Sequence, residues 1–259
     1  MMLSLIHIFQ AWRAPTDNDL SLINRDGIER EWVDFGLDAL CEQVMSADFE
    51  ETQDGIEIRV NAVHGKHSLY PCYQTLLLYR IDGGGAMDIT LKVTPLKENM
   101  HPPRLGLTLT LAAGLDVMKW YGRGPHQTYS DIMESGRVRI YESTVDAEFV
   151  PYVRPQENGN KTEVRWMSLT DRGGTGFLAK AHPLMEAGAM HYSLKNLTSA
   201  GHTWKLQHMD ETVWNLDYKQ CGIGNGACGP RTLPEYLVPC ETVEFNVTLL
   251  PVDGNEHIR

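Results

Sequence analysis

This sequence has fewer basic than acidic residues, no paired cysteine motif and no long apolar run, and each shortage excludes a class of protein. The cysteines are odd in number and have no close CxxC spacing: Cys41, Cys72, Cys221, Cys228 and Cys240. This pattern indicates neither a zinc cluster nor a disulfide framework. Reduced thiols in a cytoplasm fit it. A periplasmic location stays open, because a chain of 259 residues can bury a core without disulfides.

Acidic residues outnumber basic ones by 34 to 23, which gives a formal net charge of -11 and a pI near 5.3. Because affinity for nucleic acid comes largely from lysine and arginine, we expect no nucleic-acid partner. The start, MMLSLIHIF, is too short to span a bilayer and lacks the basic region and cleavage site of a signal peptide, so no membrane partner is expected. We interpret residues 1–9 as a leader containing a strand from Ser4 to Phe9, or as a remnant of a longer parent, and residues 10–259 as one domain.

Apolar residues alternate with polar ones along much of the chain, which predicts an all-β fold. The clearest strands are predicted at residues 56–62, 89–93, 105–111 and 243–249. Asp82 and the three glycines after it predict a hairpin turn. One helix is predicted at residues 26–35, where Ile28, Trp32 and Phe35 share a face. Since no linker or repeat divides the sequence, we expect a single domain of two large packed antiparallel sheets with few short helices.

The segment from Trp120 to Asn158 is dense in glycine, proline, aromatic residues and charge, and we interpret it as a long, tightly built loop region. Five strings in and around it resemble the C-terminal, small-chain domain of the family 2 β-galactosidases. They are WRAPTDND at 12–19, WYGRGPHQTY at 120–129, YVRPQENG at 152–159, HPLMEAGAMHYS at 182–193 and DYKQCGIGNGACGP at 217–230. The resemblance therefore covers nearly everything after Phe9.

This resemblance implies a β-supersandwich similar to the galactose mutarotases. It also implies a place in a multidomain enzyme that hydrolyses terminal β-D-galactosides with retention, through two glutamates roughly 5 Å apart. Those glutamates belong to the family's barrel domain, which would need about 250 further residues. We therefore expect no catalytic residue, cofactor or metal in this chain, and no hydrolysis by it alone. The implied partners are the remaining domains of a β-galactosidase, galactosides, and further copies of the parent in a homo-oligomer.

Two segments are candidates for contact with a bound sugar at the rim of the cleft. Arg13, Asp17, Asn18 and Asp19 surround a turn whose polar groups can bind hydroxyls or, alternatively, cap a helix. The resemblance places the residues that follow, 19–24, near the catalytic cleft. The second segment is the glycine-rich loop at residues 222–230. In this loop, Cys228 stands where many family members have a tryptophan that stacks on sugar. A thiol is too small to replace that platform.

Other polar residues are predicted to structure the loops: Arg123, His126, Tyr129, Glu157 and Asn158. The first three, together with Gln127, either stiffen the loop or bind sugar hydroxyls. Glu157 lies in the rigid PQENG turn. We expect it to hold neighbouring backbone or Arg154 rather than to act as a catalytic carboxylate.

Two other functions stay open. An autonomous, non-catalytic galactoside-binding module would carry exposed aromatic residues on one face. An aldose mutarotase or epimerase would need an acid and a base facing each other, and the candidates are His182, His191 and Glu186. His64 and His67 lack a third ligand for zinc. Four tryptophans are predicted to lie in the core: Trp120, Trp166, Trp204 and Trp214.

Overall fold

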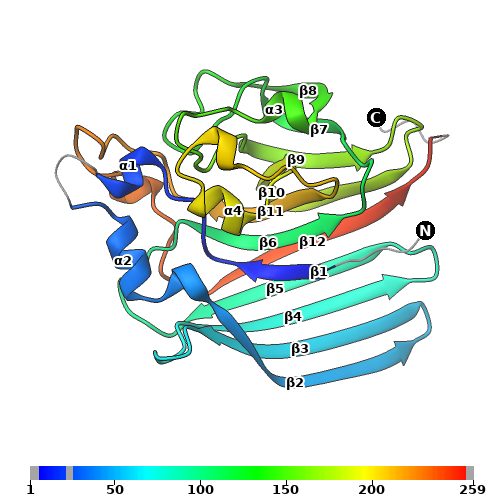
Figure 1. Cartoon of the computed structure of the whole chain (residues 1–259). Helices are drawn as coiled ribbons and strands as arrows, with labels where there is room; N and C mark the ends of the chain where they lie inside the picture. Colours follow the sequence, from blue (N-terminus) through cyan, green and yellow to red (C-terminus); the bar gives the residue numbers. More distant parts are fainter. Residues whose placement is uncertain (1–5, 22–25, 255–259) are drawn as a thin grey trace.

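The computed structural model describes residues 6–21 and 26–254, which form an all-β structure with a few short helices (Figure 1). The strands are β1 (Ile6–Gln10), β2 (Cys41–Thr52), β3 (Gly55–Gly65), β4 (Tyr73–Asp82), β5 (Met87–Pro95), β6 (Arg104–Leu111), β7 (Val117–Gly124), β8 (Arg137–Thr144), β9 (Lys161–Thr170), β10 (Gly176–Met190), β11 (Thr212–Gln220) and β12 (Val243–Val252). The helices are α1 (Asp17–Leu20), α2 (Glu29–Asp34), α3 (Val145–Glu148) and α4 (Leu194–Ser199), with 3-10 turns η1 (Leu37–Ala39), η2 (Thr203–Lys205) and η3 (Pro234–Tyr236). The predicted all-β class is confirmed.

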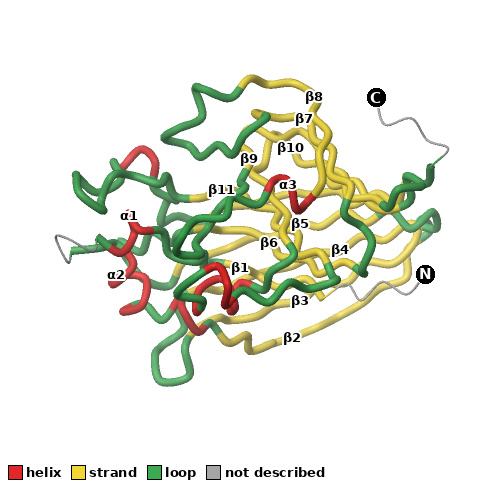
Figure 2. Tube along the Cα trace, turned by 45° about the horizontal axis from the view of Figure 1, so that its top comes forward, coloured by secondary structure: helices red, strands yellow, loops and turns green. Residues whose placement is uncertain are grey.

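These strands form one antiparallel, 12-stranded sheet whose main path runs β1-β6-β11-β10-β12-β5-β4-β3-β2. The long β10 is the branch point. Its first half pairs with β12 on one side and with β9 on the other, and β9 leads on to β7 and β8. The sheet curls on itself (Figures 1 and 2). The two packed sheets that we expected are therefore parts of a single branched sheet.

The main apolar core lies inside this curl and is built from alternate residues of the strands. Ile89 and Leu91 of β5, Leu107 and Leu109 of β6 and Phe245 of β12 are all at most 5% exposed. Because successive side chains of a strand point to opposite faces, every second residue reaches this core. The strands predicted at these positions are confirmed, as is the hairpin turn at Asp82, whose backbone N–H donates to the carbonyl of residue 86 at 3.0 Å.

The predicted helix at residues 26–35 is present but shorter, since α2 spans Glu29–Asp34. Its N-cap, Ile28, makes no side-chain capping bond, and Gly36 follows with a φ of 79°. Trp32 is 1% exposed and donates its Nε1–H to the His101 carbonyl at 2.9 Å. Residues 1–5, which include the start of the predicted leader strand, lie outside the described residues. No helix in the described part of the chain is long and apolar enough to cross a membrane.

Two expectations are wrong. The segment expected to be one long loop region contains the β7–β8 hairpin, in which Trp120 stands opposite Tyr141 with ring centroids 5.2 Å apart. Gly124 serves this packing, because a Cβ there would lie 3.0 Å from both rings. Trp204, expected in the core, is 74% exposed and stacks on His202. The other three tryptophans predicted to lie in the core are buried.

Candidate functional site

The α1 turn lies with long loops at one end of the sheet (Figure 2) and is fixed by a buried ion pair. Arg13 and Asp19 are 0% and 1% exposed and form a forked pair, with Nη2 to Oδ1 at 2.7 Å and Nε to Oδ2 at 3.1 Å. Thr16 and Asp19 complete a capping box, in which each side chain accepts from the other's backbone N–H. Arg13 also donates to the carbonyls of Cys221 and Gly222. Direct sugar contact, predicted for Arg13 and Asp19, does not fit this arrangement, because their side-chain polar groups already bond each other and the neighbouring backbone, whereas the capping alternative fits it.

Asn18 joins this turn to the glycine-rich loop. Its Nδ2 donates to the Gly224 carbonyl at 2.7 Å, and its Oδ1 accepts from the backbone N–H of Ala227 at 3.0 Å. Asp131 accepts from the backbone N–H groups of Ile223 (2.9 Å) and Gly224 (2.6 Å). The approach requires glycine, because a Cβ at Gly226 would lie 2.5 Å from the Asn18 carbonyl oxygen. Two segments 206 residues apart thus form one surface.

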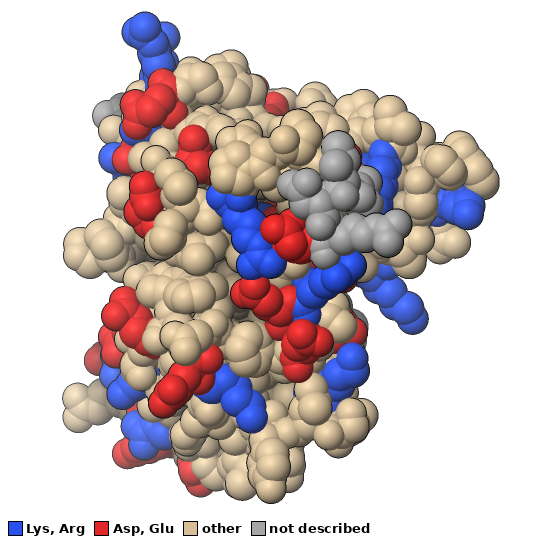
Figure 3. All heavy atoms as spheres, turned by 90° about the vertical axis from the view of Figure 1, so that its left-hand side faces the viewer, with Lys and Arg blue, Asp and Glu red and all other residues tan. Residues whose placement is uncertain are grey.

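A pocket of about 270 Å³ opens where these segments meet the PQENG turn. Its polar lining comes from Thr16, Asp17, Asn18, Gln127, Tyr129, Gln156 and Glu157. At about 30 Å³ per water this volume equals about nine waters, which is room for one small polar molecule. Asp17 and Gln156 hold each other, with Asp17 N donating to Oε1 at 3.1 Å and Nε2 donating to Oδ2 at 3.2 Å. On the face of the molecule toward this end, acidic and basic side chains are interspersed (Figure 3).

Tyr129 and Glu157 bring unused hydrogen-bonding capacity to the pocket. They are 1% and 3% exposed, and within the described residues neither the Tyr129 hydroxyl nor Glu157 Oε2 has a hydrogen-bond partner. Burial raises the pKa of Tyr129 well above its ordinary value, so the hydroxyl keeps its proton and can donate. A phenol that donates and a carboxylate oxygen that accepts suit the hydroxyls of a sugar. An unpaired buried polar group costs about 1–3 kcal/mol, so a ligand that pairs with both groups removes that cost.

Behind the pocket, one arginine holds two carboxylates. Arg104 lies 3.1 Å from Glu157 Oε1 through Nη2 and 3.0 Å from Asp217 Oδ2 through Nε. Gln220 donates to the same oxygen of Asp217 at 3.2 Å. All four residues are at most 3% exposed. The expected partner of Glu157 is corrected here: the turn directs the carboxylate inward to Arg104 rather than to Arg154.

A third buried carboxylate, Glu186, extends this cluster and accepts from Asn160 Nδ2 at 2.7 Å. Burial raises the pKa of Glu186 to about 8, so this group is protonated at neutral pH. Burial also raises the pKa of Asp217 to about 7, with Arg104 acting in the opposite direction and Glu157 adding to the rise. Neither Glu186 nor Asp217 lines the pocket, so neither group presents a proton to a ligand there.

Three of the predicted loop-structuring residues, Arg123, His126 and Asn158, bond within the protein. Arg123 pairs with Glu163 at 2.8 Å and donates to two carbonyls of the β7–β8 connection, each at 3.0 Å. His126 Nε2 is hydrogen-bonded to Ser135 Oγ at 2.8 Å. Asn158 accepts from the Val150 backbone N–H and donates to the Gln156 carbonyl, at 2.9 Å each. These contacts hold the walls of the pocket in place.

The remaining candidates do not meet at the pocket. Cys228 is exposed on the glycine-rich loop and is not part of the pocket lining, so its contact with a ligand stays a prediction. Residues 22–24 of the segment predicted near the cleft lie outside the described residues. Of the groups considered for mutarotation, Glu186 bonds Asn160 and His191 bonds the Glu211 carbonyl. His64 is buried and bonded to Thr75.

A wider, more open depression of about 890 Å³ lies between the β5–β6 connection and residues 234–241. Polar side chains in it include Lys97, His101 and Lys219. Its lining contains none of the orphaned buried side-chain atoms found within the described residues. The smaller pocket is therefore the better candidate, because unpaired polar atoms of Tyr129 and Glu157 lie in its wall.

The sequence analysis did not single out Arg104, Asp217 and Gln220 as members of a site. A usable signal was present in the strand TVWNLDYKQ, where Asp217 closely follows Val213, Trp214 and Leu216. A carboxylate at a buried strand position requires a partner. That partner, Arg104, lies 113 residues away in the sequence, so no local pattern could identify it.

The sequence is similar to known proteins over most of its length. The family described as "Beta galactosidase small chain" matches residues 1–249. The β-galactosidase of Priestia megaterium is 34% identical over 228 residues, which cover 88% of this chain and 21% of that protein. The β-galactosidase of Staphylococcus xylosus is 27% identical over 238 residues, which cover 92% of this chain and 23% of that protein. The chain therefore spans between a fifth and a quarter of the length of these relatives.

Among solved structures, the chain is similar to a protein assigned as an aldose 1-epimerase from Escherichia coli K12, with a TM-score of 0.41 and 10% identity over 82% of this chain and 68% of that chain. At that score the likeness carries no argument about function. The family match extends over nearly the whole chain and does carry one: the protein belongs to the β-galactosidase small-chain family.

Proposed function

We propose that this chain is a domain of a β-galactosidase that hydrolyses terminal β-D-galactosides with retention, and that it forms part of the rim of the sugar-binding cleft. The observation that carries this proposal is the junction made by Asn18, which brings the α1 turn and the glycine-rich loop together at one pocket. A cleft-completing domain needs that meeting of loops. The nucleophile and the acid/base would be two glutamates of another domain.

The pocket would act by binding and orienting sugar hydroxyls. Tyr129 can donate to a hydroxyl and Glu157 Oε2 can accept from one, while Asp17 and Gln156 are already paired to each other at the wall. Arg104 keeps the Glu157 carboxylate in place from behind. A site held by its own supporting contacts positions a ligand without reordering side chains during binding.

The remaining domains would need a surface on which to dock, and we propose that β2 provides this surface. This strand lies at the edge of the sheet and exposes Val44 (50%), Met45 (62%) and Phe49 (76%). An edge strand with exposed apolar side chains is normally covered by another part of a protein. The pocket lining contains no residue of β2, so a domain docked on this strand would leave the pocket open to the cleft.

The experiment is a chimera with the Priestia megaterium relative. Its matched segment is deleted or replaced by this chain, and hydrolysis of a chromogenic galactoside is measured. We expect the deletion to be inactive, the chimera to be active and the isolated chain to be inactive. Within the chimera, Tyr129→Phe and Glu157→Gln should each lower kcat/KM about tenfold, about 1.4 kcal/mol of transition-state stabilisation. Trp204→Ala, at an exposed position outside the pocket, is the matched control.

Two results would overturn the proposal. Hydrolysis by the isolated chain would mean that it carries its own catalytic carboxylates. A chimera that folds but stays inactive would mean that the domain does not complete the cleft.

The alternative is an autonomous galactoside-binding module, and exposed Trp204 is the observation that favours it. The other strongly exposed aromatic residues, Phe49 and Tyr70, belong to different parts of the chain, in β2 and between β3 and β4. Calorimetry of the isolated chain with galactose and lactose separates the two functions. Binding that is lost in Trp204→Ala but kept in Glu157→Gln would favour the module.

A further inference from the structure

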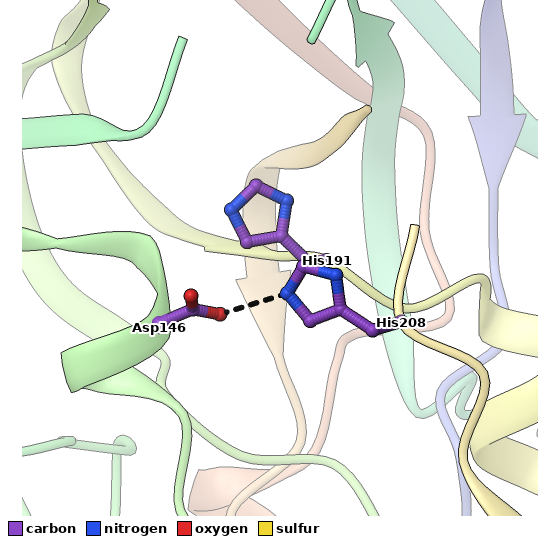
Figure 4. Close-up of side chains that lie close together, drawn as sticks. All are labelled: Asp146, His191 and His208. Atoms are coloured by element: carbon purple, nitrogen blue, oxygen red, sulfur yellow. Dashed lines mark hydrogen bonds and ion pairs between the residues drawn. The ribbon is translucent and has the colours of Figure 1, made fainter. Parts of the chain in front are cut away.

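Three metal-ligating side chains meet at a place that is not part of the pocket. Asp146, His191 and His208 each offer one ligand atom, and these atoms all lie within 4.8 Å of one another. Asp146 belongs to α3, His191 directly follows β10, and His208 lies between η2 and β11 (Figure 4). Thus three separate segments contribute one donor each.

Backbone contacts hold the two histidines beside each other. The backbone N–H of Met209 donates to the His191 carbonyl at 2.8 Å. The two imidazole rings have centroids 4.8 Å apart and an interplanar angle of 31°. Tyr192 packs edge-on against His208 at 5.6 Å. The pair is therefore arranged before any ligand arrives.

The hydrogen bonds leave suitable lone pairs. His191 Nδ1 lies 3.0 Å from the Glu211 carbonyl, which can only accept, so Nδ1 carries the proton and the lone pair is on Nε2. A histidine that donates one ring N–H to a carbonyl and offers the other nitrogen is the usual form of a metal ligand. His208 Nε2 lies 3.2 Å from Asp146 Oδ1, where a metal ion would replace the proton between them.

We propose that Asp146, His191 and His208 bind a divalent transition metal such as Zn²⁺, with solvent as the fourth ligand. Two imidazoles and a carboxylate select zinc and its neighbours over Mg²⁺ and Ca²⁺, which prefer all-oxygen sites. Metal–ligand distances of about 2.0–2.2 Å place tetrahedral donors about 3.4 Å apart. The side chains of His208 and Asp146 are 49% and 66% exposed, so they are free to close the remaining separation.

Such an ion would tie α3 to the connection between β10 and β11, across 62 residues of sequence between Asp146 and His208. A clip that closes a long loop restricts the unfolded chain and so favours the folded state. The family resemblance led us to expect no metal in this chain. The site therefore goes beyond the proposed function and does not depend on it.

The test is calorimetric titration of the chelator-treated full chain with Zn²⁺, followed by thermal unfolding with and without the ion. We expect one high-affinity equivalent and a Tm that rises with Zn²⁺ concentration. His208→Ala and Asp146→Ala should each weaken binding at least tenfold and abolish the rise in Tm. Both positions are exposed, so both variants should fold, which circular dichroism checks.

The matched control is His202→Ala, an exposed histidine on the same connection whose ring stacks on Trp204 at 5.5 Å. It should bind Zn²⁺ like the parent chain. As a geometric readout, Co²⁺ should give the intense visible bands of a tetrahedral site, and these should vanish in His208→Ala. Equal Zn²⁺ affinity in the parent chain and in His208→Ala, or Mg²⁺ that displaces Zn²⁺ at equal concentration, would overturn the proposal.

Discussion

The main core inside the curled sheet is built from apolar side chains such as Leu91 and Leu107, each 0% exposed. At the pocket end, the buried side chains include Arg104, Asp217 and Glu157, which are nearly as inaccessible but ionisable. Burial of the first kind is favourable by itself. Burial of the second kind is tolerated only while the charges satisfy one another. The difference teaches that the sheet interior supplies the stability and that the pocket end uses part of it to hold polar groups in fixed positions.

Removing the cation that two buried carboxylates share should break the pocket end most severely. Arg104→Met leaves Glu157 and Asp217 buried without their cation, which should lower the free energy of unfolding by about 3–5 kcal/mol. Urea unfolding measures the change. Adding Asp217→Leu should recover part of the loss, because it removes one of the two carboxyl groups left without a partner. A loss of under about 1 kcal/mol in the single variant would contradict this account of the cluster.

The matching change in the apolar region is Leu107→Ala. It removes buried methyl groups and leaves a cavity, so the free energy of unfolding should fall by about 2–5 kcal/mol. Here the loss should be the same at every pH at which the protein is folded, because no titrating group is involved. A strong pH dependence of this loss, measured by urea unfolding, would contradict the separation of the two regions.

Glu186 should give the pocket end a pH dependence that the apolar core lacks. Burial raises its pKa from 4.5 to about 8. Between pH 4.5 and about 8 the native state therefore keeps a proton that the unfolded chain releases, and stability is lost as the pH rises through this range. For one proton the slope is at most about 1.4 kcal/mol per pH unit. Glu186→Gln should flatten the profile measured by urea unfolding. Asp217, whose pKa burial raises to about 7, contributes in the same direction and remains in the variant.

Most of the apolar half of this comparison could be predicted from the sequence. Alternation at Ile89 and Leu91, and again at Leu107 and Leu109, identified strands whose inward residues are buried. Such a pattern is local, because each strand carries its own period. The hairpin turn at Asp82 was equally local. The family, too, could be identified from short contiguous strings.

The polar half could be predicted only in part. Glycine and proline marked residues 120–158 as unusual, but the β7–β8 hairpin within them was missed because glycines that permit ring packing look like glycines that permit turns. The pairing of Arg104 with Glu157 joins residues 53 apart, and that with Asp217 joins residues 113 apart. No local pattern encodes such partners. The sequence around Trp204 likewise gave no sign that its ring would be exposed.

The smallest predicted effect on stability tests whether the pocket end serves position more than stability. Asn18→Ala removes two hydrogen bonds between the α1 turn and the glycine-rich loop, at a partly exposed position, so the free energy of unfolding should fall by only about 1 kcal/mol. Because the same bonds align the two loops at the pocket, kcat/KM of the galactosidase chimera should fall about tenfold, which is a loss of about 1.4 kcal/mol. Leu107→Ala provides the control, since it should lower stability more and kcat/KM less at a temperature where the chimera stays folded. If Asn18→Ala left kcat/KM unchanged while costing the expected stability, the junction would be an ordinary loop contact. The contrast between a core that stabilises and an end that positions would then rest on Tyr129 and Glu157 alone.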